Sequence, residues 1–385
     1  MIPPHAMPGV SLDSARLQAD LLAWFAAHGR DLPWRRHRSL YGTWISEMML
    51  QQTTVATVVP YWERFLRRFP DVATLAAAPE EEVLALWSGL GYYRRARQLH
   101  AAARQVAAAG GKLPTDAEGW RSLPGVGPYA AGAIASLGLG LPEPAVDANV
   151  RRVLSRWLGS PGTPLKPSER ELAAVAGSLV PVAAPGAWNE ALMELGAVVC
   201  LPRQPACSAC PVAAHCGAGG QPDGLVVADG PPGVAPAPVG VIMVAFVCGP
   251  LLWLEPAGGP ALPCPGAGAP VRDDFTRLHA GLFTLPMTGW YPLPAGAREQ
   301  AGPLADLARQ AGAALPDGAE LVAGARFRHA ITRYRLAVEV VRCSLPPGAA
   351  AAPAGGRPAG AWVRRDGAAG LAVSQLARKA LRSIA

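Results

Sequence analysis

The sequence of 385 residues predicts a mainly α N-terminal part followed by a separate C-terminal α+β domain. Within residues 12–216, apolar residues recur at three- and four-residue spacing, as in amphipathic helices. Residues 217–238 are rich in Gly and Pro, a composition typical of an interdomain linker. After this stretch the pattern changes to short β-type runs. A chain of this length can bury two or three separate hydrophobic cores.

Helices are predicted where the helical spacing is clearest, over residues 14–28, 43–69, 80–86 and 94–109. The short breaks between them favour antiparallel helices joined by tight loops. In the C-terminal part, strands are predicted over residues 239–247, 251–254 and 334–341, and a helix over residues 304–313. The most apolar run, 239–254, is too short to span a membrane and is broken by Gly249-Pro250. We therefore expect a β-hairpin there.

The composition is that of a globular protein, since half of the residues are hydrophobic and 16% are charged. This excludes an intrinsically disordered chain. The net charge of +7 favours a polyanionic partner without identifying it. The N-terminus lacks a basic-then-apolar signal pattern, so a cytoplasmic protein is expected. In that compartment clustered cysteines suggest metal or cluster ligation, because thiols there stay reduced.

Four cysteines lie close together in the pattern Cys200-x6-Cys207-x2-Cys210-x5-Cys216. Four thiolates within one short segment can surround a single inorganic centre. A structural zinc ion is one possibility, with His215 as a further potential ligand. One close pair flanked by two wider gaps is also compatible with a [4Fe–4S] cluster, which takes four Cys ligands. The spacing favours the cluster modestly, and the remaining cysteines are interpreted as ordinary thiols: Cys248, Cys264 and Cys343.

The string LPGVGPYAAGAI over residues 123–134 predicts a helical hairpin. Gly125, Val126 and Gly127 form its tight turn, and Pro128 suits the first turn of the following helix. Backbone N–H groups at such a helix N-terminus can hold a phosphate without reading sequence. The alternative is an ordinary connection between two helices, which a bare Gly-x-Gly would favour, but the whole string is much more specific.

Two carboxyl groups are candidates for acid chemistry. Glu47 lies in a predicted helix that is apolar nearly all round, so burial is expected to raise its pKa and keep it protonated. Asp147 lies between a proline break and the next predicted helix, where an N-cap aspartate is expected to stay ionised. Such a pair suits cleavage of a glycosidic bond, in which one acid protonates the leaving group and one carboxylate stabilises the sugar cation.

Together and in this order, the motifs resemble the helix-hairpin-helix glycosylase superfamily, which includes endonuclease III, and within it the adenine DNA glycosylase (MutY) family. The resemblance covers nearly the whole chain. Besides the motifs above, it is carried by Leu32-Pro-Trp-Arg35, Ser46-Glu-Met-Met-Leu-Gln-Gln-Thr53 and Gly89-Leu-Gly-Tyr-Tyr93. It implies an iron–sulfur cluster helical domain over 1–30 and 145–216, a six-helix barrel with the hairpin over 31–144, a linker over 217–238 and a Nudix-like domain over 239–385.

The resemblance also implies ligands and roles. A [4Fe–4S] cluster is bound by Cys200, Cys207, Cys210 and Cys216. Glu47 protonates the flipped adenine and Asp147 stabilises the resulting cation, while Tyr129 and Asn149 support that site. The positions that line the adenine pocket are Arg30, Leu32, Trp34, Leu50 and Glu190. The positions that wedge into the duplex or touch 8-oxoguanine are Gln52, Thr53 and Tyr92, with Tyr93 as the alternative to Tyr92.

One position distinguishes two reaction types. In bifunctional enzymes of the endonuclease III type, a lysine after the hairpin attacks the sugar as a Schiff-base nucleophile. This chain has Tyr129 there, and a phenol cannot form an imine. We therefore expect base removal that leaves the DNA backbone uncut.

The C-terminal region resembles the Nudix-like domain with which the family senses 8-oxoguanine. Residues 281–286, GLFTLP, are similar to a Gly-Leu-Trp-Glu-Phe-Pro motif, but residues 287–313 lack the spaced glutamates that bind magnesium. Hydrolysis of nucleoside diphosphates is therefore not expected. Where many relatives have Phe-Ser-His in the sensing loop, this chain has Ile331, Thr332 and Arg333. Thr332 keeps a hydroxyl that can hydrogen-bond the lesion.

The expected function is that of a monomeric, monofunctional glycosylase acting on double-stranded DNA with adenine opposite 8-oxoguanine or guanine. The first alternative is a glycosylase/lyase of the endonuclease III type, against which Tyr129 and the added C-terminal domain both argue. The second is a damage-binding protein without catalysis, which would not require both Glu47 and Asp147. The third is a cluster-containing redox regulator, which would need neither the hairpin nor the acid pair.

Overall fold

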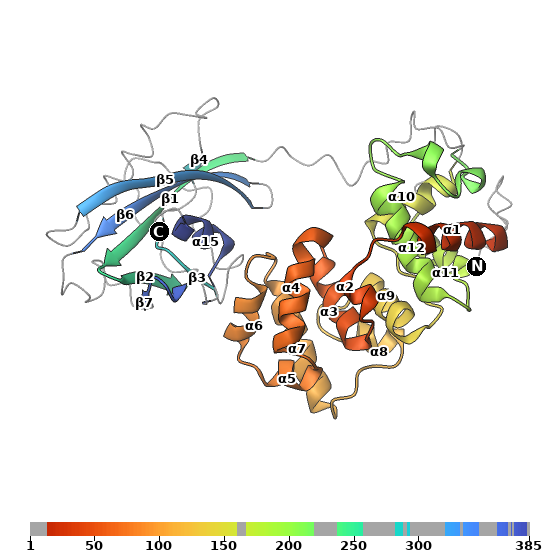
Figure 1. Ribbon diagram of the computed structural model, residues 1–385, viewed down its shortest axis with the longest axis horizontal. Helices are drawn as coiled ribbons and strands as arrows, with labels where there is room; N and C mark the ends of the chain where they lie inside the picture. Colours follow the sequence, from red (N-terminus) through yellow and green to blue (C-terminus); the bar gives the residue numbers. More distant parts are fainter. Residues whose placement is uncertain are drawn as a thin grey trace. The chain divides into compact units, whose positions relative to one another are not determined.

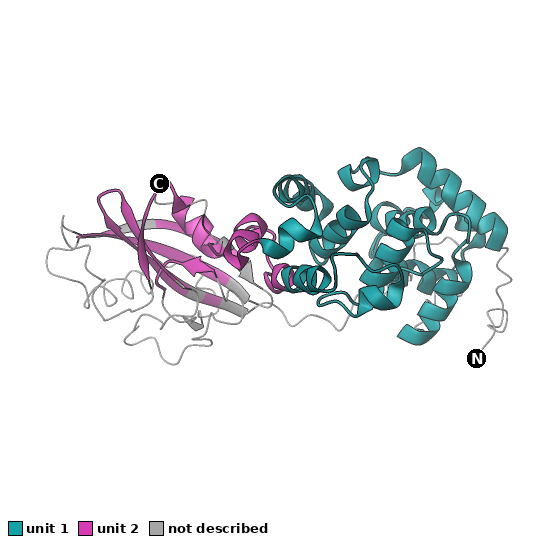
Figure 2. Cartoon of the chain, turned by 90° about the horizontal axis from the view of Figure 1, so that it is seen from below, with its two compact units in different colours: residues 1–77, 98–232 teal, residues 78–97, 233–385 magenta. Residues whose placement is uncertain are grey.

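The computed structural model divides into two compact units, shown in Figure 2: residues 1–77 with 98–232, and residues 78–97 with 233–385. The structure describes residues 14–159, 167–218, 237–256, 282–287, 291–292, 320–331, 334–345, 360–368, 371 and 373–382. None of the helices in these ranges is long and apolar enough to cross a membrane.

The N-terminal part is helical, which confirms the predicted fold class (Figure 1). Its α-helices are α1 (Ser14–His28), α2 (Pro33–Arg36), α3 (Leu40–Leu50), α4 (Val55–Arg68), α5 (Val72–Ala77), α6 (Glu80–Trp87), α7 (Arg94–Ala108), α8 (Ala117–Arg121), α9 (Pro128–Leu139), α10 (Ala148–Trp157), α11 (Glu169–Leu179) and α12 (Pro185–Val198). Two short 3₁₀ helices follow, η1 (Cys207–Ala209) and η2 (Ala213–His215).

The single helix predicted over residues 43–69 is wrong, because two helices, α3 and α4, share this stretch. Between them Gln52 has a φ of 56°, in the left-handed region that breaks an α-helix. Thr54 is extended and precedes the first residue of α4. The apolar spacing continues across the break, so periodicity alone could not reveal it.

The C-terminal part contains one mixed sheet with a helix, as the predicted α+β class requires. Its strands are β1 (Ala237–Cys248), β2 (Leu251–Pro256), β3 (Phe283–Thr284), β4 (Tyr291–Pro292), β5 (Glu320–Ile331), β6 (Tyr334–Ser344) and β7 (Ala361–Arg364), and its helix is α15 (Gln375–Arg382). The sheet order is β3-β2-β1-β6-β5, with β4 beside β1 and β7 beside β2. Strands β1 and β6 are parallel, and the other pairs are antiparallel.

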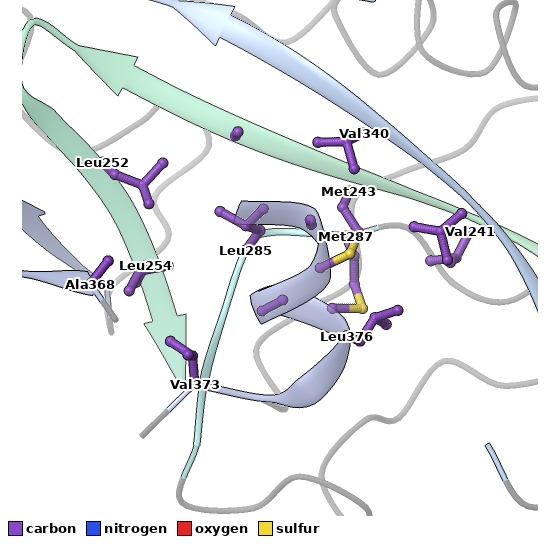
Figure 3. Packing of buried hydrophobic residues seen from close by; sticks show 14 of the residues in the cluster. Val241, Met243, Leu252, Leu254, Leu285, Met287, Val340, Ala368, Val373 and Leu376 are labelled. Atoms are coloured by element: carbon purple, nitrogen blue, oxygen red, sulfur yellow. The ribbon is translucent and has the colours of Figure 1, made fainter. Parts of the chain in front are cut away.

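The predicted hairpin at Gly249-Pro250 is confirmed, because β1 and β2 pair with Cys248 opposite Leu251. Strand β5 was not predicted, and the predicted helix over residues 304–313 lies outside the described residues. One face of the sheet carries a core that includes Val241, Met243 and Val340, which Figure 3 shows together with Leu376 of α15. A separate core in the helical unit contains Leu17, Leu154 and Leu195, among others.

Candidate active site

Glu47 lies in the middle of α3 among fully buried apolar side chains, including Trp44, Ile45 and Met48. Its own side chain is buried, with 4% of the residue exposed. Burial raises the pKa of Glu47 from its usual 4.5 to about 7, because the charged form loses its hydration. The predicted burial and pKa direction are confirmed. A carboxyl group of this kind carries a proton near neutral pH and can donate it.

Tyr129 contacts this acid directly. Helix α9 begins at Pro128 and packs against α3, which brings the first turn of α9 to Glu47. The Tyr129 hydroxyl donates a hydrogen bond to Glu47 Oε2 at 2.8 Å and lies 3.3 Å from Met193 Sδ. The hydrogen bond lowers the pKa of Glu47 but less than burial raises it. Tyr129 therefore orients the carboxyl group while leaving it protonated.

The turn before Tyr129 has the predicted hairpin geometry. Gly125 has a φ of 82°, and a Cβ there would lie 2.8 Å from Gln98 Cβ and 2.9 Å from Met48 Cε. Glycine is therefore required by both backbone conformation and packing. A Cβ on Gly127 would meet no atom within 4 Å. Val126 between them is buried and its N–H bonds to Leu123 O.

Asp147 caps the N-terminus of α10, as predicted. Its Oδ1 accepts from the backbone N–H of Val150 at 2.7 Å, and its Oδ2 accepts from Asn149 Nδ2 at 3.0 Å. Burial raises the pKa of Asp147, while these hydrogen bonds and the nearby charge of Arg152 lower it. The cap thus opposes the cost of burying the Asp147 carboxylate without cancelling it, so the pKa of Asp147 is still raised.

The acid and the capped carboxylate are close enough to influence each other. The negative charges of Asp147 and Glu190 both raise the pKa of Glu47. Glu47 and Asp147 differ in their surroundings. Glu47 accepts one hydrogen bond from a phenol, whereas Asp147 accepts hydrogen bonds from a backbone amide and a side-chain amide. That difference favours a proton on Glu47 and a negative charge on Asp147.

Glu190 and Glu194, one turn apart on α12, are buried beside three arginines. Glu190 accepts from Arg35 Nε at 3.0 Å and from Arg38 Nη2 at 2.7 Å. Glu194 accepts from Arg35 Nη2 at 3.0 Å and from Arg30 Nη2, also at 3.0 Å. Arg35 therefore joins the two carboxylates into one network, whereas Arg30 forms its ion pair with Glu194 and not with Glu190.

Arg38 and Glu194 were not among the predicted site residues, and Arg35 was named only as part of a motif. Arg38 and Glu190 are 152 positions apart, so no local spacing signals their pairing. The signal in the sequence that could have indicated this network is a cluster of arginines next to a predicted pocket residue. Buried carboxylates need such partners.

The other expected pocket residues differ in exposure. Leu32 and Trp34 are buried, with Trp34 packed edge-on against Trp62 at 5.9 Å between ring centroids. Leu50, the last residue of α3, is partly exposed. Trp34 is thus at least in part a core residue, whereas Leu50 retains surface that a ligand can contact.

Two of the residues expected to touch the duplex have an unusual backbone conformation. Gln52 and Tyr92 are the non-glycine residues with positive φ in the described chain, at 56° and 48°. Gln52 is exposed and Thr53 is partly exposed, and 52% of Tyr92 is exposed. Tyr93 is buried and lies 3.3 Å from Ser88 Oγ. Of the two tyrosines, Tyr92 is therefore the one with surface that a ligand can contact. Thr332 of the predicted sensing loop lies outside the described residues.

The four clustered cysteines line one small cavity after α12, together with Arg156, Leu195 and other residues. All four are free thiols. In the described ranges, no three His, Cys, Asp or Glu side chains are grouped as a site for a single metal ion. Four cysteines that line one cavity supply the donor types that an iron–sulfur cluster takes, so the residue types present fit that group. Arg156 donates to Cys200 Sγ at 3.1 Å.

Arg152, fully within α10, connects this loop to the capped aspartate. Its Nε donates to Cys200 O at 2.9 Å and its Nη2 to Asn149 Oδ1 at 2.8 Å. Asn149 in turn donates to Asp147. A continuous path of hydrogen bonds therefore runs from the cysteine loop to the candidate catalytic carboxylate.

A family model for HhH-GPD superfamily base excision DNA repair proteins matches residues 45–177, which contain Glu47, the hairpin and Asp147. The class defined by fold and site is therefore a helix-hairpin-helix base excision repair protein. The adenine DNA glycosylase of Mycolicibacterium smegmatis is 42% identical over 200 residues, which cover 51% of this chain and 67% of that protein. The chain belongs to the adenine DNA glycosylase family.

Other relatives agree. The human adenine DNA glycosylase is 46% identical over 210 residues, covering 52% of this chain and 38% of the human protein. The mouse protein is 45% identical, with 44% of its length covered, so the chain spans less than half the length of these mammalian relatives. Among solved structures, a thermostable thymine-DNA glycosylase is 30% identical with a TM-score of 0.50, covering 54% of this chain and 96% of that structure.

Proposed function

We propose that this protein excises adenine paired with 8-oxoguanine or guanine in double-stranded DNA, by acid-assisted hydrolysis of the N-glycosidic bond. The observation that carries this proposal is the buried Glu47, whose pKa is raised to about 7, held by Tyr129 and placed within electrostatic reach of the capped Asp147. Adenine is inferred as the excised base from the names of the family members, and acid catalysis is inferred from the geometry of the site.

Each carboxyl group has one task in this mechanism. Glu47 transfers its proton to a nitrogen of the flipped adenine, so that the bonding electron pair of the breaking N-glycosidic bond leaves with a neutral base. Asp147 faces the oxocarbenium-like sugar and stabilises its positive charge. A water molecule then adds to the sugar carbon and releases a proton. Tyr129 keeps Glu47 oriented, and Asn149 keeps Asp147 oriented.

The reaction stops at base removal. The residue after the hairpin is a tyrosine, and its phenol is engaged with Glu47. Burial and the neighbouring carboxylates raise the pKa of Tyr129 well above 10, so its phenolate is not available as a nucleophile either. No amine stands at this position, so a Schiff base with the sugar is not expected here.

The chain is proposed to bind a [4Fe–4S] cluster through Cys200, Cys207, Cys210 and Cys216. When bound, the cluster would crosslink the loop that follows α12, and Arg156 would neutralise part of its negative charge. Metal analysis of the purified protein tests this assignment. About four iron atoms per chain with matching sulfide supports it, whereas stoichiometric zinc contradicts it.

The C-terminal α+β domain is proposed to sense 8-oxoguanine. The reasons are the resemblance of its sequence to the Nudix-like domain of the family and the mixed sheet with β1 parallel to β6. In this proposal a single protein molecule binds the DNA. The hairpin of Gly125 to Gly127 contacts phosphates, and the bases are contacted by Gln52, Thr53 and Tyr92.

The decisive experiment follows one labelled duplex carrying a single adenine opposite 8-oxoguanine under single-turnover conditions. Wild-type protein should give strand breaks only after alkali treatment, because base removal leaves an alkali-labile abasic site. Glu47→Gln should lower the rate by about 10²- to 10⁴-fold, the usual contribution of a general acid. Glu63→Gln, an exposed position on α4, serves as the matched control and should behave as wild type.

Two results would redirect the assignment. Strand breaks without alkali, together with a borohydride-trapped protein–DNA adduct, would identify a lyase. Intact duplex with a cluster-loaded protein that still binds it would identify a damage-binding protein without catalysis. A thymine lesion in place of adenine, tested in parallel, separates base specificity from loss of activity.

A further inference from the structure

A cavity of about 620 Å³ lies in the C-terminal domain, where β2, β7 and α15 meet. Its apolar lining includes Leu252 of β2, Val373 just before α15, and Leu381 within α15. Leu252 and Val373, both labelled in Figure 3, also belong to the core of this domain. The floor of the cavity is therefore shared with the hydrophobic core of this domain.

Arginines surround this floor. Arg364 and Arg365 come from the end of β7, and Arg378 and Arg382 from α15. The two helix residues are four positions apart and so lie on one face of α15. Asp366 is the acidic residue of the lining, and its carboxylate is bound by Arg364 at 3.1 and 2.9 Å. The lining is therefore strongly positive around an apolar base.

Arg378 leaves part of its hydrogen-bonding capacity unused. Its Nε is buried and has no hydrogen-bond partner, whereas its backbone N–H bonds to Ser374 O. A buried donor without an acceptor costs free energy, and an acceptor arriving in the cavity would recover it. Carboxylates are suited to this task, because they accept two parallel bonds from one guanidinium.

We propose that this cavity docks an acidic peptide segment of a partner protein, with an apolar side chain on the floor and carboxylates on Arg378 and Arg382. Duplex DNA fits less well, because its backbone offers phosphates but no apolar group to fill the cavity. The combination of apolar floor and cationic wall instead matches a peptide anchor with acidic neighbours. This site is independent of the proposed excision chemistry.

The test uses the full-length protein and fluorescence anisotropy of a labelled nine-residue peptide, in which four aspartates precede Leu-Phe. Binding should weaken about tenfold or more in R378Q and in R382Q, as for an anchoring arginine. Replacing Leu-Phe of the peptide by Ser-Ser should weaken binding about tenfold as well. R382Q alters an exposed residue, so its effect does not depend on the packing of α15.

K379Q is the matched control. Lys379 follows Arg378 in α15, and K379Q removes the same positive charge as R378Q. Its Nζ is directed to Arg328 O at 3.4 Å, and it does not line the cavity. Its peptide affinity should stay within about twofold of wild type. Equal weakening in K379Q would reduce the effect to general charge attraction and overturn the proposal.

The remaining outcomes also oppose the proposal. Equal binding of the Ser-Ser peptide would show that the apolar floor is not used. Loss of affinity for duplex DNA in R378Q and R382Q, as large as the loss for the peptide, would make the arginines a DNA surface. No binding of the Leu-Phe peptide to wild type would remove the site altogether.

Discussion

At the scale of single residues, Glu47 shows how a common side chain becomes an acid at neutral pH. The same carboxyl group on a solvated helix face would lose its proton near pH 4.5. Here its burial in α3 outweighs the hydrogen bond from Tyr129, and the charges of Asp147 and Glu190 add to the effect. The helix therefore supplies the environment, and a single hydrogen bond supplies the orientation.

The raised pKa of about 7 predicts how base excision depends on pH. Above pH 7 the folded protein loses the proton of Glu47, so the single-turnover rate should fall about tenfold for each further pH unit. Rates of adenine release between pH 6 and 9 measure this. Glu63→Gln should keep the same profile, and a rate that stays constant up to pH 9 would contradict the role of Glu47 as the acid.

The same shift has a consequence for stability. Because the folded state holds the Glu47 proton up to about pH 7 and the unfolded chain only to about 4.5, the free energy of unfolding falls as pH rises through this window. Glu47→Gln removes this dependence. The free energy of unfolding of the variant, relative to that of wild type, should therefore increase by about 3 kcal/mol between pH 4 and pH 8. Urea unfolding of both proteins at these two pH values measures the difference, and an equal pH dependence in both would contradict it.

At the scale of elements, α12 is held by charge pairs that reach across the helical unit. Glu190 and Glu194 face arginines from α2 and from the segments on either side of it. Three arginines against two carboxylates leave the network positively charged, which limits how much Glu190 repels a negative charge on Glu47. The electrostatics of the acid are thus set partly by residues that do not touch it.

Arg38→Gln tests this arrangement. Glu190 would lose its partner at 2.7 Å and keep Arg35, so its negative charge would act more strongly on Glu47. The alkaline limb of the rate profile should move to higher pH by a few tenths of a unit, with little loss of stability because Arg38 is partly exposed. Arg36→Gln is the matched control, since Arg36 pairs with the exposed Asp31 at 3.2 Å. An unchanged profile in Arg38→Gln would show that the pair is only structural.

At the scale of the whole molecule, the two units have separate hydrophobic cores. One core is built from helices and includes Leu195, and the other is built from the sheet and α15 and includes Val340. Cores without shared side chains can unfold separately. The cysteine loop and helix α10, which Asp147 caps, both pack on the first core.

Two core substitutions test this separation. Leu195→Ala should lower the unfolding temperature of the helical unit, at a cost of about 2–5 kcal/mol for a buried Leu to Ala change. Val340→Ala should lower the transition of the sheet-containing unit by a smaller amount and leave the helical one in place. Differential scanning calorimetry resolves the two transitions. If either substitution moves both transitions together, the cores are coupled.

Much of the architecture follows from local sequence alone. Helical spacing, the proline at the start of α9, the aspartate before α10 and Gly249-Pro250 between β1 and β2 each predicted the element that is observed. Burial of Glu47 also followed from its apolar neighbours. These features depend on residues within one or two turns of one another, so local sequence patterns are enough to predict them.

Other features depend on contacts that local sequence does not show. The arginine pairs of Glu190 and the path from Cys200 through Arg152 to Asp147 depend on partners distant in sequence. Strand β5 contains Gly324 and several charged residues, and it becomes a strand because β6 supplies its hydrogen bonds. The balance of charges at the acid likewise depends on which groups folding brings within a few ångströms, because electrostatic interactions and hydrogen bonds act through space.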